Sequence, residues 1–351
     1  MKVSIGTNIK EGPWGGGNLF AINIKKYLET KGHKVVTDLN DSDIDIILLT
    51  EPRRTSESSA YTHIDVENYL NYINGKTLVV HRVNECDERK NTNYVNKYLI
   101  EANKVADYTV FVSTWLRDIY EEQGINKKQN HVILDGADRA IFNEKGRALW
   151  NQEEKLKIVT HHWGANWNKG FDIYSKLDNL LEESFYKNYF EFTYIGNLPK
   201  NFSFKNTKVI KPLSGSNLAK EIKKNHVYLT ASLNEPSGNH HIEGAQCGLP
   251  VLYINSGGIP EYCHGFGLEF NKDNFSEILE EMRTNYDKHL KHMEKYPFNS
   301  QNMCKAFERM FNDMLEKRDN ILSKRNLINK QNTIARRIYL ARRKLKLTKS
   351  K

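Results

Sequence analysis

The segment Glu235-Pro-Ser-Gly-Asn-His-His-Ile-Glu243 places two carboxylates eight positions apart around a glycine. A short β-prone run at residues 227–231 precedes it, and another at residues 249–254 follows it, so the pattern predicts a strand, a loop, a helix and a strand. Ser237 and Asn239 are both suitable N-caps for that helix. In an open parallel sheet, such a loop lies at the carboxyl end of its strand, where ligands bind.

The chemistry of this segment favours a ligand that carries both phosphate and hydroxyl groups. Unpaired N–H groups at the N-terminus of the predicted helix attract an anion such as phosphate. The two carboxylates would repel a diphosphate unless they pointed at hydroxyl groups, which donate hydrogen bonds to them. Because a nucleotide sugar has both parts, the sequence predicts a nucleotide-sugar site here.

This segment resembles the glutamate-x7-glutamate motif of the retaining glycosyltransferases of family 4. Glu235 and Glu243 match the two glutamates, and Gly238 matches the inner glycine. Two later turns of the family are matched by Cys247-Gly-Leu-Pro250 and by Gly258-Ile-Pro-Glu261. The resemblance implies an α/β chain with the GT-B fold, in which two Rossmann-like domains with parallel sheets face each other across a cleft.

The chain is long enough for two domains, each with its own core, because it has 351 residues. We expect an N-terminal, acceptor-side domain over residues 1–150 and a nucleotide-sugar-binding domain over residues 151–298. A helix at residues 299–318 is expected to cross back to the N-terminal domain. Residues 319–351 form a basic, amphipathic tail.

The resemblance implies transfer of a sugar from a nucleoside diphosphate donor to an acceptor hydroxyl, with retention at the anomeric carbon. It implies no cofactor and no obligatory metal. In this family Glu235 would hold hydroxyl groups of the donor sugar, Glu243 the ribose, and Lys169 the departing diphosphate. His81, placed after an expected strand at residues 77–80, corresponds to a histidine that faces the donor sugar. The predicted catalytic residues are therefore Glu235, His81 and Lys169.

Loops supply the other predicted donor contacts. A glycine loop follows the first expected strand, residues 3–8, and glycines there can admit a phosphate or a sugar closely. The resemblance places this loop in the cleft. The predicted donor-binding residues are Gly15, Gly16, Gly17, His162, Lys169, Gly196, Glu235, Ser237, Gly238, Asn239, His240 and Glu243.

One departure from the family concerns the loop after an expected strand at residues 156–160. Lys169-Gly170 matches the lysine and glycine that hold the donor diphosphate, but the arginine that accompanies them in the family is missing. His161, His162 and Trp163 stand near its place. Neighbouring histidines can bind a metal, yet no third ligand follows at a suitable spacing, so we predict no metal site.

The acceptor is expected to lie against the N-terminal domain and to be a glycan, a glycolipid or another hydroxyl compound. Basic residues in the loops 51–71 and 87–98, such as Arg89 and Lys90, favour an acidic or phosphate-bearing acceptor, whereas charged loops are more often only solvated. The predicted acceptor-side residues are Arg82, Asn84, Glu85 and Asp87.

The net charge of +9 comes from the tail. Residues 321–351 hold eleven lysines and arginines and no acidic residue, and taking these eleven from +9 leaves about −2 for the rest of the chain. An anionic membrane surface is one candidate partner for this tail; packing on the protein body and simple solvation are the alternatives. No nucleic-acid partner is expected, since no base-reading module is evident. The apolar stripe of the tail is Leu327, Ile334, Ile338, Ala341 and Leu345.

The cysteines and the hydropathy pattern indicate a cytoplasmic location, with peripheral attachment to the inner face of a membrane as a variant of it. No stretch reaches the roughly 18 apolar residues of a spanning helix. The cysteines lack the close pairs of zinc or redox sites, so reduced and mostly buried thiols are expected. They are Cys86, Cys247, Cys263 and Cys304.

Two other functions remain open on the sequence. One is a different GT-B enzyme, such as a sugar-nucleotide epimerase. The other is a non-catalytic protein of the same fold that binds a nucleotide or a glycan, and the missing arginine and the unusual run Asn239-His240-His241 motivate it. Turnover distinguishes an enzyme from a binding protein. For an enzyme, assembly of a surface polysaccharide, glycolipid or other glycan is the expected role.

Overall fold

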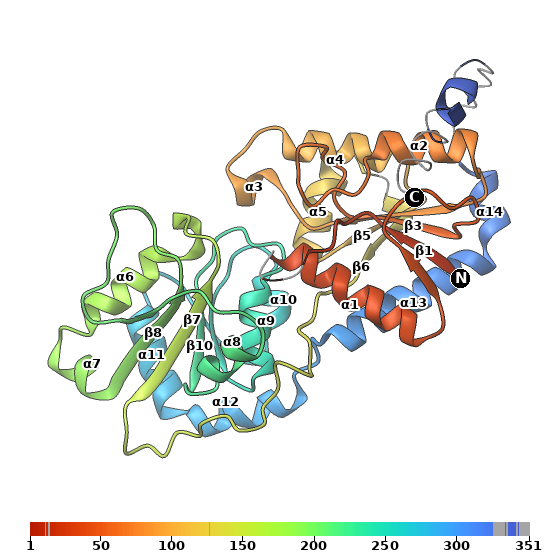
Figure 1. The fold of residues 1–351 in the computed structure, drawn as a ribbon. Coiled ribbons are helices and arrows are strands. Elements are labelled where there is room, and N and C mark those ends of the chain that lie inside the picture. The colour runs from red at the N-terminus through yellow and green to blue at the C-terminus, as the bar shows by residue number, and fades with distance from the viewer. Residues whose placement is uncertain are drawn as a thin grey trace.

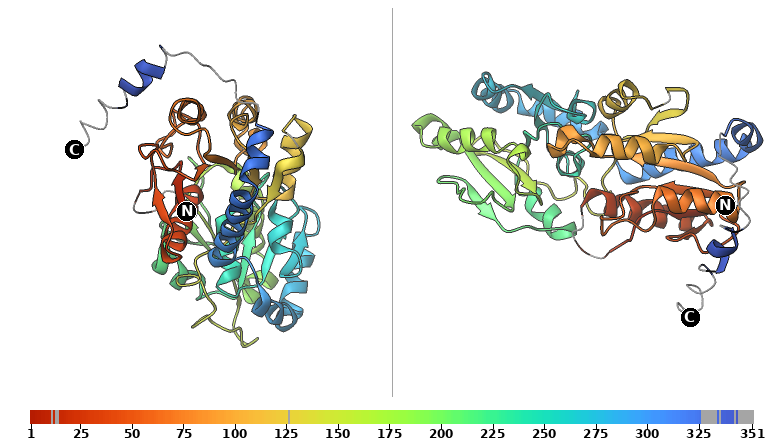
Figure 2. Two further views of the ribbon diagram at one scale, coloured as in Figure 1. Left: turned by 90° about the vertical axis from the view of Figure 1, so that its right-hand side faces the viewer. Right: turned by 90° about the horizontal axis from the view of Figure 1, so that it is seen from above.

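The structure is a computed structural model, and it contains two α/β domains that lie side by side (Figure 1). One long helix, α13 (Ser300–Glu316), runs from the second domain along the first (Figure 2). The residues that the structure describes are 1–10, 12, 15–125, 127–325, 334, 336–341 and 343, and for residue 127 only the backbone.

The N-terminal domain is built on a parallel sheet with the strand order β2-β1-β3-β4-β5-β6. Its central strands β3 and β4 are buried along their whole length, which is typical of parallel strands covered by helices on both faces. The strands are β1 (Lys2–Ile5), β2 (Lys34–Val36), β3 (Ile46–Leu49), β4 (Leu78–Val83), β5 (Tyr108–Phe111) and β6 (Asn130–Val132).

Helices cover both faces of this sheet (Figure 1). The last helices of the chain, α13 and α14, belong to this domain by packing, because Phe20 of α1 and Phe307 of α13 meet with ring centroids 5.2 Å apart. The helices are α1 (Gly16–Thr30), α2 (His63–Tyr72), α3 (Asp87–Lys90), α4 (Val95–Asn103), α5 (Thr114–Glu122) and α14 (Arg318–Ser323), with a short 3-10 turn at Lys127–Gln129.

The C-terminal domain has a second parallel sheet, with the strand order β12-β11-β10-β7-β8-β9. The first strand of the domain, β7, lies in the middle, and the order reverses between β7 and β10, as in the Rossmann arrangement. The strands are β7 (Leu156–His162), β8 (Phe190–Gly196), β9 (Lys208–Ile210), β10 (Val227–Thr230), β11 (Val251–Ile254) and β12 (Gly267–Phe270).

The helices of this domain follow its strands in sequence and bury one apolar face each against the sheet. They are α6 (Phe171–Leu180), α7 (Ser184–Tyr189), α8 (Gly215–Ile222), α9 (Asn239–Gln246), α10 (Ile259–Cys263), α11 (Phe275–Thr284) and α12 (Tyr286–His292), with 3-10 turns at Trp167–Lys169 and Met293–Lys295.

The two domains contact each other near the two segments where the chain passes from one domain to the other. The Ser300 N–H donates to the Ala137 carbonyl at 2.8 Å, so the outgoing and returning chains lie side by side. The Glu261 carboxylate of the C-terminal domain accepts from the N–H groups of Thr114 at 2.8 Å and Trp115 at 3.0 Å. These N–H groups lie in the first turn of α5, where no carbonyl of the helix can reach them. The structure therefore shows the domains in a docked arrangement.

Several predicted features can be compared with the structure directly. All four cysteines are buried and unpaired, as expected. No helix in the described part of the chain is long and apolar enough to cross a bilayer. In the tail, residues 336–341 are helical and Ile334 and Ile338 are exposed. Leu327 and Leu345 lie outside the described residues, so the continuous stripe stays a prediction.

Candidate functional site

The loops that follow β7 and β10 meet at the point where the strand order reverses, which is where open α/β sheets bind ligands. Lys169 ends the 3-10 turn after β7, and Glu235 lies in the loop after β10. The Lys169 Nζ atom is 2.6 Å from Glu235 Oε2. From the other domain, Arg89 at the end of α3 places its Nε 2.9 Å from Glu235 Oε1. Glu235 therefore joins cations of both domains.

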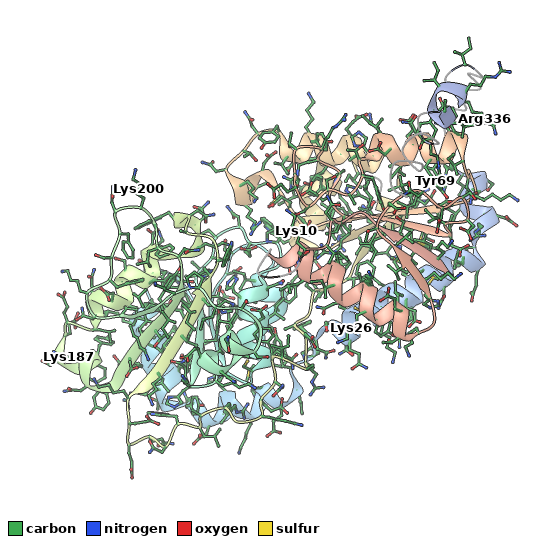
Figure 3. All side chains as sticks on the ribbon, in the orientation of Figure 1. Lys10, Lys26, Tyr69, Lys187, Lys200 and Arg336 are labelled. Atoms are coloured by element: carbon green, nitrogen blue, oxygen red, sulfur yellow. The ribbon has the colours of Figure 1, made fainter. Side chains whose placement is uncertain are left out.

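The Glu235 side chain is only 5% exposed. Burial on its own would raise the pKa of this carboxyl, but Lys169 and Arg89 outweigh burial and lower the pKa to about 2. Glu235 is therefore an ionised acceptor throughout the physiological pH range. Surface lysines on the same domain, such as Lys187 and Lys200, are exposed and point into solvent (Figure 3), so Lys169 differs from them by its burial.

Because the pKa of Glu235 is low in the folded protein, protonation of this carboxylate at acidic pH is expected to destabilise the fold. Because the folded-state pKa lies below the ordinary value of 4.5, ionised Glu235 stabilises the folded protein above about pH 4.5, and this contribution disappears as the pH falls towards about 2. The shift corresponds to about 3 kcal/mol. Urea unfolding of the wild type and Glu235→Gln between about pH 5 and about pH 2 should show their stability difference shrinking by this amount. A difference that stays constant over that range would contradict the assignment.

A small cavity of about 30 Å³ lies between the domains at this position. Three of its lining side chains are cationic and one is a carboxylate, so an anion that entered it would meet positive charge from both sides. Its lining residues are Arg89, Lys90, Asn166, Asn168, Lys169, Leu233 and Glu235.

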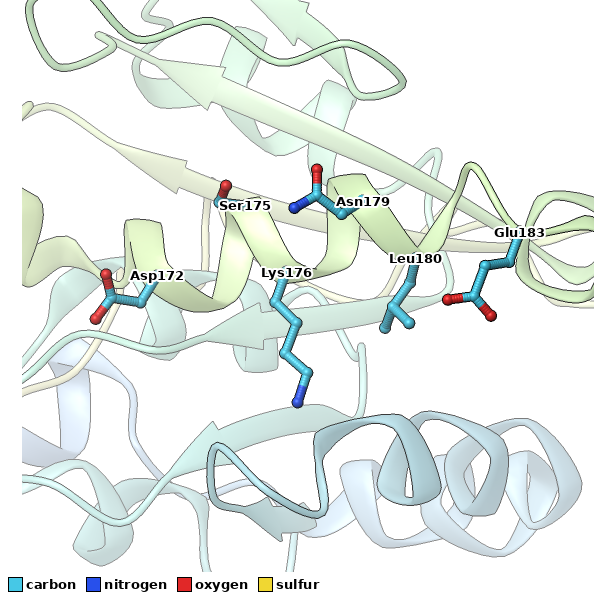
Figure 4. A pocket seen from close by; sticks show the side chains of 6 residues that line it. All are labelled: Asp172, Ser175, Lys176, Asn179, Leu180 and Glu183. Atoms are coloured by element: carbon cyan, nitrogen blue, oxygen red, sulfur yellow. The ribbon is translucent and has the colours of Figure 1, made fainter.

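A larger hollow of about 320 Å³ lies beside α6 (Figure 4). Its lining comes from one helix and the turn after it and includes none of the predicted site residues. We assign it no ligand. The lining residues are Asp172, Ser175, Lys176, Asn179, Leu180 and Glu183.

Glu243, on α9, is oriented by a histidine of the neighbouring strand. His161 Nε2 lies 2.9 Å from Glu243 Oε2, and His161 Nδ1 lies 3.0 Å from the hydroxyl of Tyr228. With the tyrosine donating to Nδ1, the ring donates its Nε2–H to the carboxylate. Glu243 lies in the second turn of α9, the helix that follows the loop of Glu235. The hydrogen bond from His161 holds its carboxylate in one orientation.

His162 and His240 were predicted to contact the donor, but the side chains of both are buried inside the C-terminal domain. The expected strand at residues 156–160 continues to His162, so this ring packs inward and lies 2.7 Å from the Tyr174 hydroxyl. His240 lies 2.7 Å from the Thr230 hydroxyl. Burial lowers the pKa of both rings well below the ordinary value. They are neutral groups of the core that support α9.

His81 was predicted to be catalytic, and the structure contradicts its expected position. The strand expected at residues 77–80 extends to Val83, because pairing with β3 reaches His81 and pairing with β5 continues to Val83. The ring is fully buried, its Nδ1 accepts from the side-chain amide of Asn103 of α4 at 3.1 Å, and burial lowers its pKa to about 3. His81 is a neutral core histidine between β4 and α4.

Arg82 was predicted to face the acceptor, but it is 2% exposed and pairs with Asp135 at 2.8 Å. The same carboxylate accepts from Ser237 at 2.8 Å. Ser237 therefore links the Glu235 loop to the N-terminal domain. Its hydroxyl donates to Asp135 and does not cap α9. Gly238 is the N-cap of α9, and neither Ser237 nor Asn239 provides a side-chain cap.

The other predicted acceptor-side residues have different surroundings. Glu85 binds the two basic residues of α3, with Arg89 Nη1 and Lys90 Nζ each 3.1 Å from its carboxylate. Asp87 accepts from the backbone N–H groups at residues 94–96 and so fixes the start of α4, which is a structural role. Asn84 is half-buried beside the glycine loop.

The glycine loop brings the domains close together. Gly15 has a φ of 82° and immediately precedes α1, and a Cβ on Gly16 would lie 3.2 Å from the Asn239 side chain of α9. A Cβ on Gly17 would lie 3.9 Å from Asn84. The N-termini of α1 and α9 therefore face the same interdomain space.

Gly196 ends β8 with a φ of 149°, and a Cβ there would lie 2.0 Å from the His162 carbonyl oxygen. This position requires glycine because two strands approach closely, so its observed role is packing. A Cβ on Gly238 would lie within 2.7 Å of the rings of His240 and His241. Among the described residues, no cluster of three or more His, Cys, Asp or Glu side chains could hold a metal ion.

Comparison with solved structures identifies the fold. A glycosyltransferase from Rickettsia africae ESF-5 matches with a TM-score of 0.63 and 14% identity, over 90% of this chain and 98% of that one. Anabaena Alr3699/HepE in complex with UDP matches with a TM-score of 0.64 and 12% identity, over 89% and 99%. Sucrose-phosphate synthase from Thermosynechococcus elongatus matches with a TM-score of 0.58 and 13% identity, over 90% and 99%.

The chain has the GT-B fold. This confirms the predicted fold class of two facing Rossmann-like domains with parallel sheets. No protein-family model and no curated protein sequence matches the chain. At 12–14% identity, the likeness to solved structures establishes the fold and leaves the activity to be argued from the residues.

Three residues of this GT-B cleft were not recognised from the sequence as site or docking residues. Arg89 was assigned to an acceptor loop, yet it pairs with Glu235 of the other domain. Asp135 joins Arg82 to Ser237. Glu261 caps α5 across the domain boundary. No local pattern could reveal these pairs, because each partner lies on an element far away in the sequence.

Proposed function

We propose that this protein is a glycosyltransferase that moves a sugar from a nucleoside diphosphate donor to an acceptor hydroxyl. The observation that carries the proposal is the ionised, buried Glu235 between Lys169 and Arg89 at the reversal of strand order. Solved structures of the same fold support it, since Alr3699/HepE is described in complex with UDP and with UDP-glucose.

In this proposal the cations hold the diphosphate and the carboxylates hold the hydroxyl groups. Lys169 and the N–H groups at the start of α9 stabilise the negative charge that develops on the leaving diphosphate. Glu235 accepts from hydroxyls of the donor sugar, and Glu243 accepts from the ribose while His161 keeps its orientation. A second anion beside Glu235 is tolerable because Lys169 and Arg89 already compensate its charge.

We further propose retention of configuration at the anomeric carbon, without an obligatory metal. The leaving phosphate itself would accept the proton of the acceptor hydroxyl, which is consistent with a site in which Glu235 is committed to two cations and so is unsuited to attack carbon. The acceptor is a glycan, glycolipid or other hydroxyl compound in surface polysaccharide or glycan assembly. The basic tail at residues 321–351 would hold the enzyme at the inner, anionic face of a membrane.

The same cleft would serve a non-catalytic protein that binds a nucleoside diphosphate, or a sugar-nucleotide epimerase. No separate observation favours the binding protein. The epimerase is not favoured either, because the buried histidines His81, His162 and His240 are committed to the core and are poorly placed for acid–base work. Sugar transfer to an acceptor separates the proposed enzyme from both alternatives.

Thermal unfolding with a panel of nucleoside diphosphates and their sugars tests the proposal. A ligand at about 100 times its Kd should stabilise the protein by about 2.7 kcal/mol. We expect one base to stand out, with the shift lost in Lys169→Ala and Glu243→Ala and kept in the surface control Lys187→Ala. Release of the nucleoside diphosphate in the presence of acceptors then measures turnover. A folded wild-type protein that responds to no nucleotide would refute the proposal.

A further inference from the structure

Arg89 lies in the donor cleft but belongs to the N-terminal domain. Its guanidinium has two carboxylate neighbours, because Nη1 is 3.1 Å from Glu85 of its own domain and Nε is 2.9 Å from Glu235 of the other. Lys90 follows it along α3 and lines the same cavity as Lys169. Positive charge therefore reaches the cavity from both sides of the cleft.

The contact of Arg89 with Glu235 is an ion pair without a hydrogen bond. Although the two atoms are 2.9 Å apart, the Nε–H does not point along the line to the carboxylate, and this buried Nε has no hydrogen-bond acceptor among the described residues. A buried donor without an acceptor costs free energy. An oxygen of an entering ligand would remove that cost if it lay on the direction of the N–H bond.

We infer that Arg89 is a second cationic contact for the diphosphate of the donor, supplied across the cleft by the N-terminal domain, and that Glu235 holds it in place until the donor binds. This inference rests on the proposed function. A guanidinium presents a planar fork of donors that fits two phosphate oxygens. Once a phosphate oxygen accepts a hydrogen bond from the Arg89 Nε–H, Glu235 remains paired with Lys169 and can accept hydrogen bonds from sugar hydroxyls.

This arrangement makes donor binding depend on both domains. Lys169 alone gives the C-terminal domain one side-chain cation at the cavity, and Arg89 and Lys90 add two more only when the domains are docked. The diphosphate would therefore bind most tightly in the docked arrangement, and water would be kept from the leaving group there. The affinity for a nucleoside without phosphates should not depend on Arg89.

Titration calorimetry of Arg89→Gln with inorganic pyrophosphate, with the nucleoside diphosphate selected by the thermal panel and with the corresponding nucleoside tests the inference. Pyrophosphate serves as a probe that needs no knowledge of the base. We expect the affinity for pyrophosphate and for the nucleoside diphosphate to fall at least about tenfold, with the affinity for the nucleoside unchanged. Arg117→Gln is the matched control, because Arg117 lies on α5 of the same domain, pairs with Asp118 and does not line the cavity. Its affinities should equal those of the wild type.

The outcomes separate the inference from the function on which it rests. If the wild type binds nucleoside diphosphate and Arg89→Gln binds it equally well, the inference is wrong and the proposed function stands. The inference is also wrong if nucleoside and pyrophosphate affinities fall together, since that indicates general damage to the cleft. If the wild type binds neither diphosphate, the proposed function itself fails. Should Arg89→Gln not fold, Arg89→Lys keeps the charge and loses the fork, so pyrophosphate should bind about threefold more weakly, and unchanged affinity overturns the inference.

Discussion

Replacing Glu235 with glutamine is expected to lower kcat/KM for sugar transfer by about 10²-fold to 10³-fold. The amide has nearly the same shape but carries no charge, so it leaves Lys169 and Arg89 without their shared counter-ion. It also replaces one acceptor oxygen by an N–H donor, which faces the same hydroxyls and cations less favourably. Release of nucleoside diphosphate from the donor found by the thermal panel, with saturating acceptor, measures the loss.

Binding should respond differently from turnover in the same variant. With the competing carboxylate removed, Lys169 and Arg89 are free for the diphosphate, so the affinity for inorganic pyrophosphate should be equal to or higher than that of the wild type. Glu183→Gln is the matched control, because Glu183 is an exposed carboxylate of the same domain outside the cleft. Turnover of Glu235→Gln close to the wild-type rate would rule out the proposed role of this carboxylate.

Replacing Arg82 with methionine is expected to destabilise the protein by about 3–5 kcal/mol. The guanidinium is 2% exposed, pairs with Asp135 at 2.8 Å and lies over the Phe20 ring at 3.9 Å. Methionine fills much of the volume but leaves the buried Asp135 carboxylate without its cation. The free energy of unfolding in urea, measured near neutral pH, gives the effect.

Two further variants test whether the loss comes from the unpaired charge. Arg117→Met removes a half-buried arginine of the same domain, which pairs with exposed Asp118, and should change stability by less than about 0.5 kcal/mol. Adding Asp135→Asn to Arg82→Met removes the stranded carboxylate and should recover part of the loss. A change below about 1 kcal/mol in Arg82→Met would show that the buried pair is not a major source of stability.

The strands and the site loop were predictable because their signals are local. An apolar run such as residues 249–254 predicts a buried parallel strand from a few neighbouring residues, and the structure contains β11 there, at Val251–Ile254. The loops after such strands then predict that Lys169 and Glu235 lie at the carboxyl edge of one sheet, and the structure places them 2.6 Å apart. Strand ends were less predictable. β4 and β7 both continue two or three residues beyond the expected limits.

These extended strands explain the residues that were misassigned. A polar residue after an apolar run looks like the start of a loop, but hydrogen bonds to the adjacent strand can keep it in the sheet. His81 and His162 were read as loop residues and are instead buried inside strands. The hydrogen-bond partner of His81 is Asn103 of α4, and that of His162 is Tyr174 of α6. Because both partners lie on helices, the sequence of the strand alone could not reveal them.

The sequence by itself determined the two parallel-sheet domains, the approximate order of their elements, the presence of Lys169 and Glu235 in loops that follow strands, and the presence of Glu243 on the helix after one of those loops. Only the tertiary structure decided which charges meet. Arg89 and Glu235 lie far apart in the chain, on different domains, and become partners because the domains dock through contacts such as that of Glu261 with α5. Local periodicity depends on neighbouring residues, whereas ion pairs and burial depend on how distant elements pack, so the positive lining of the cleft could be seen only in the folded chain.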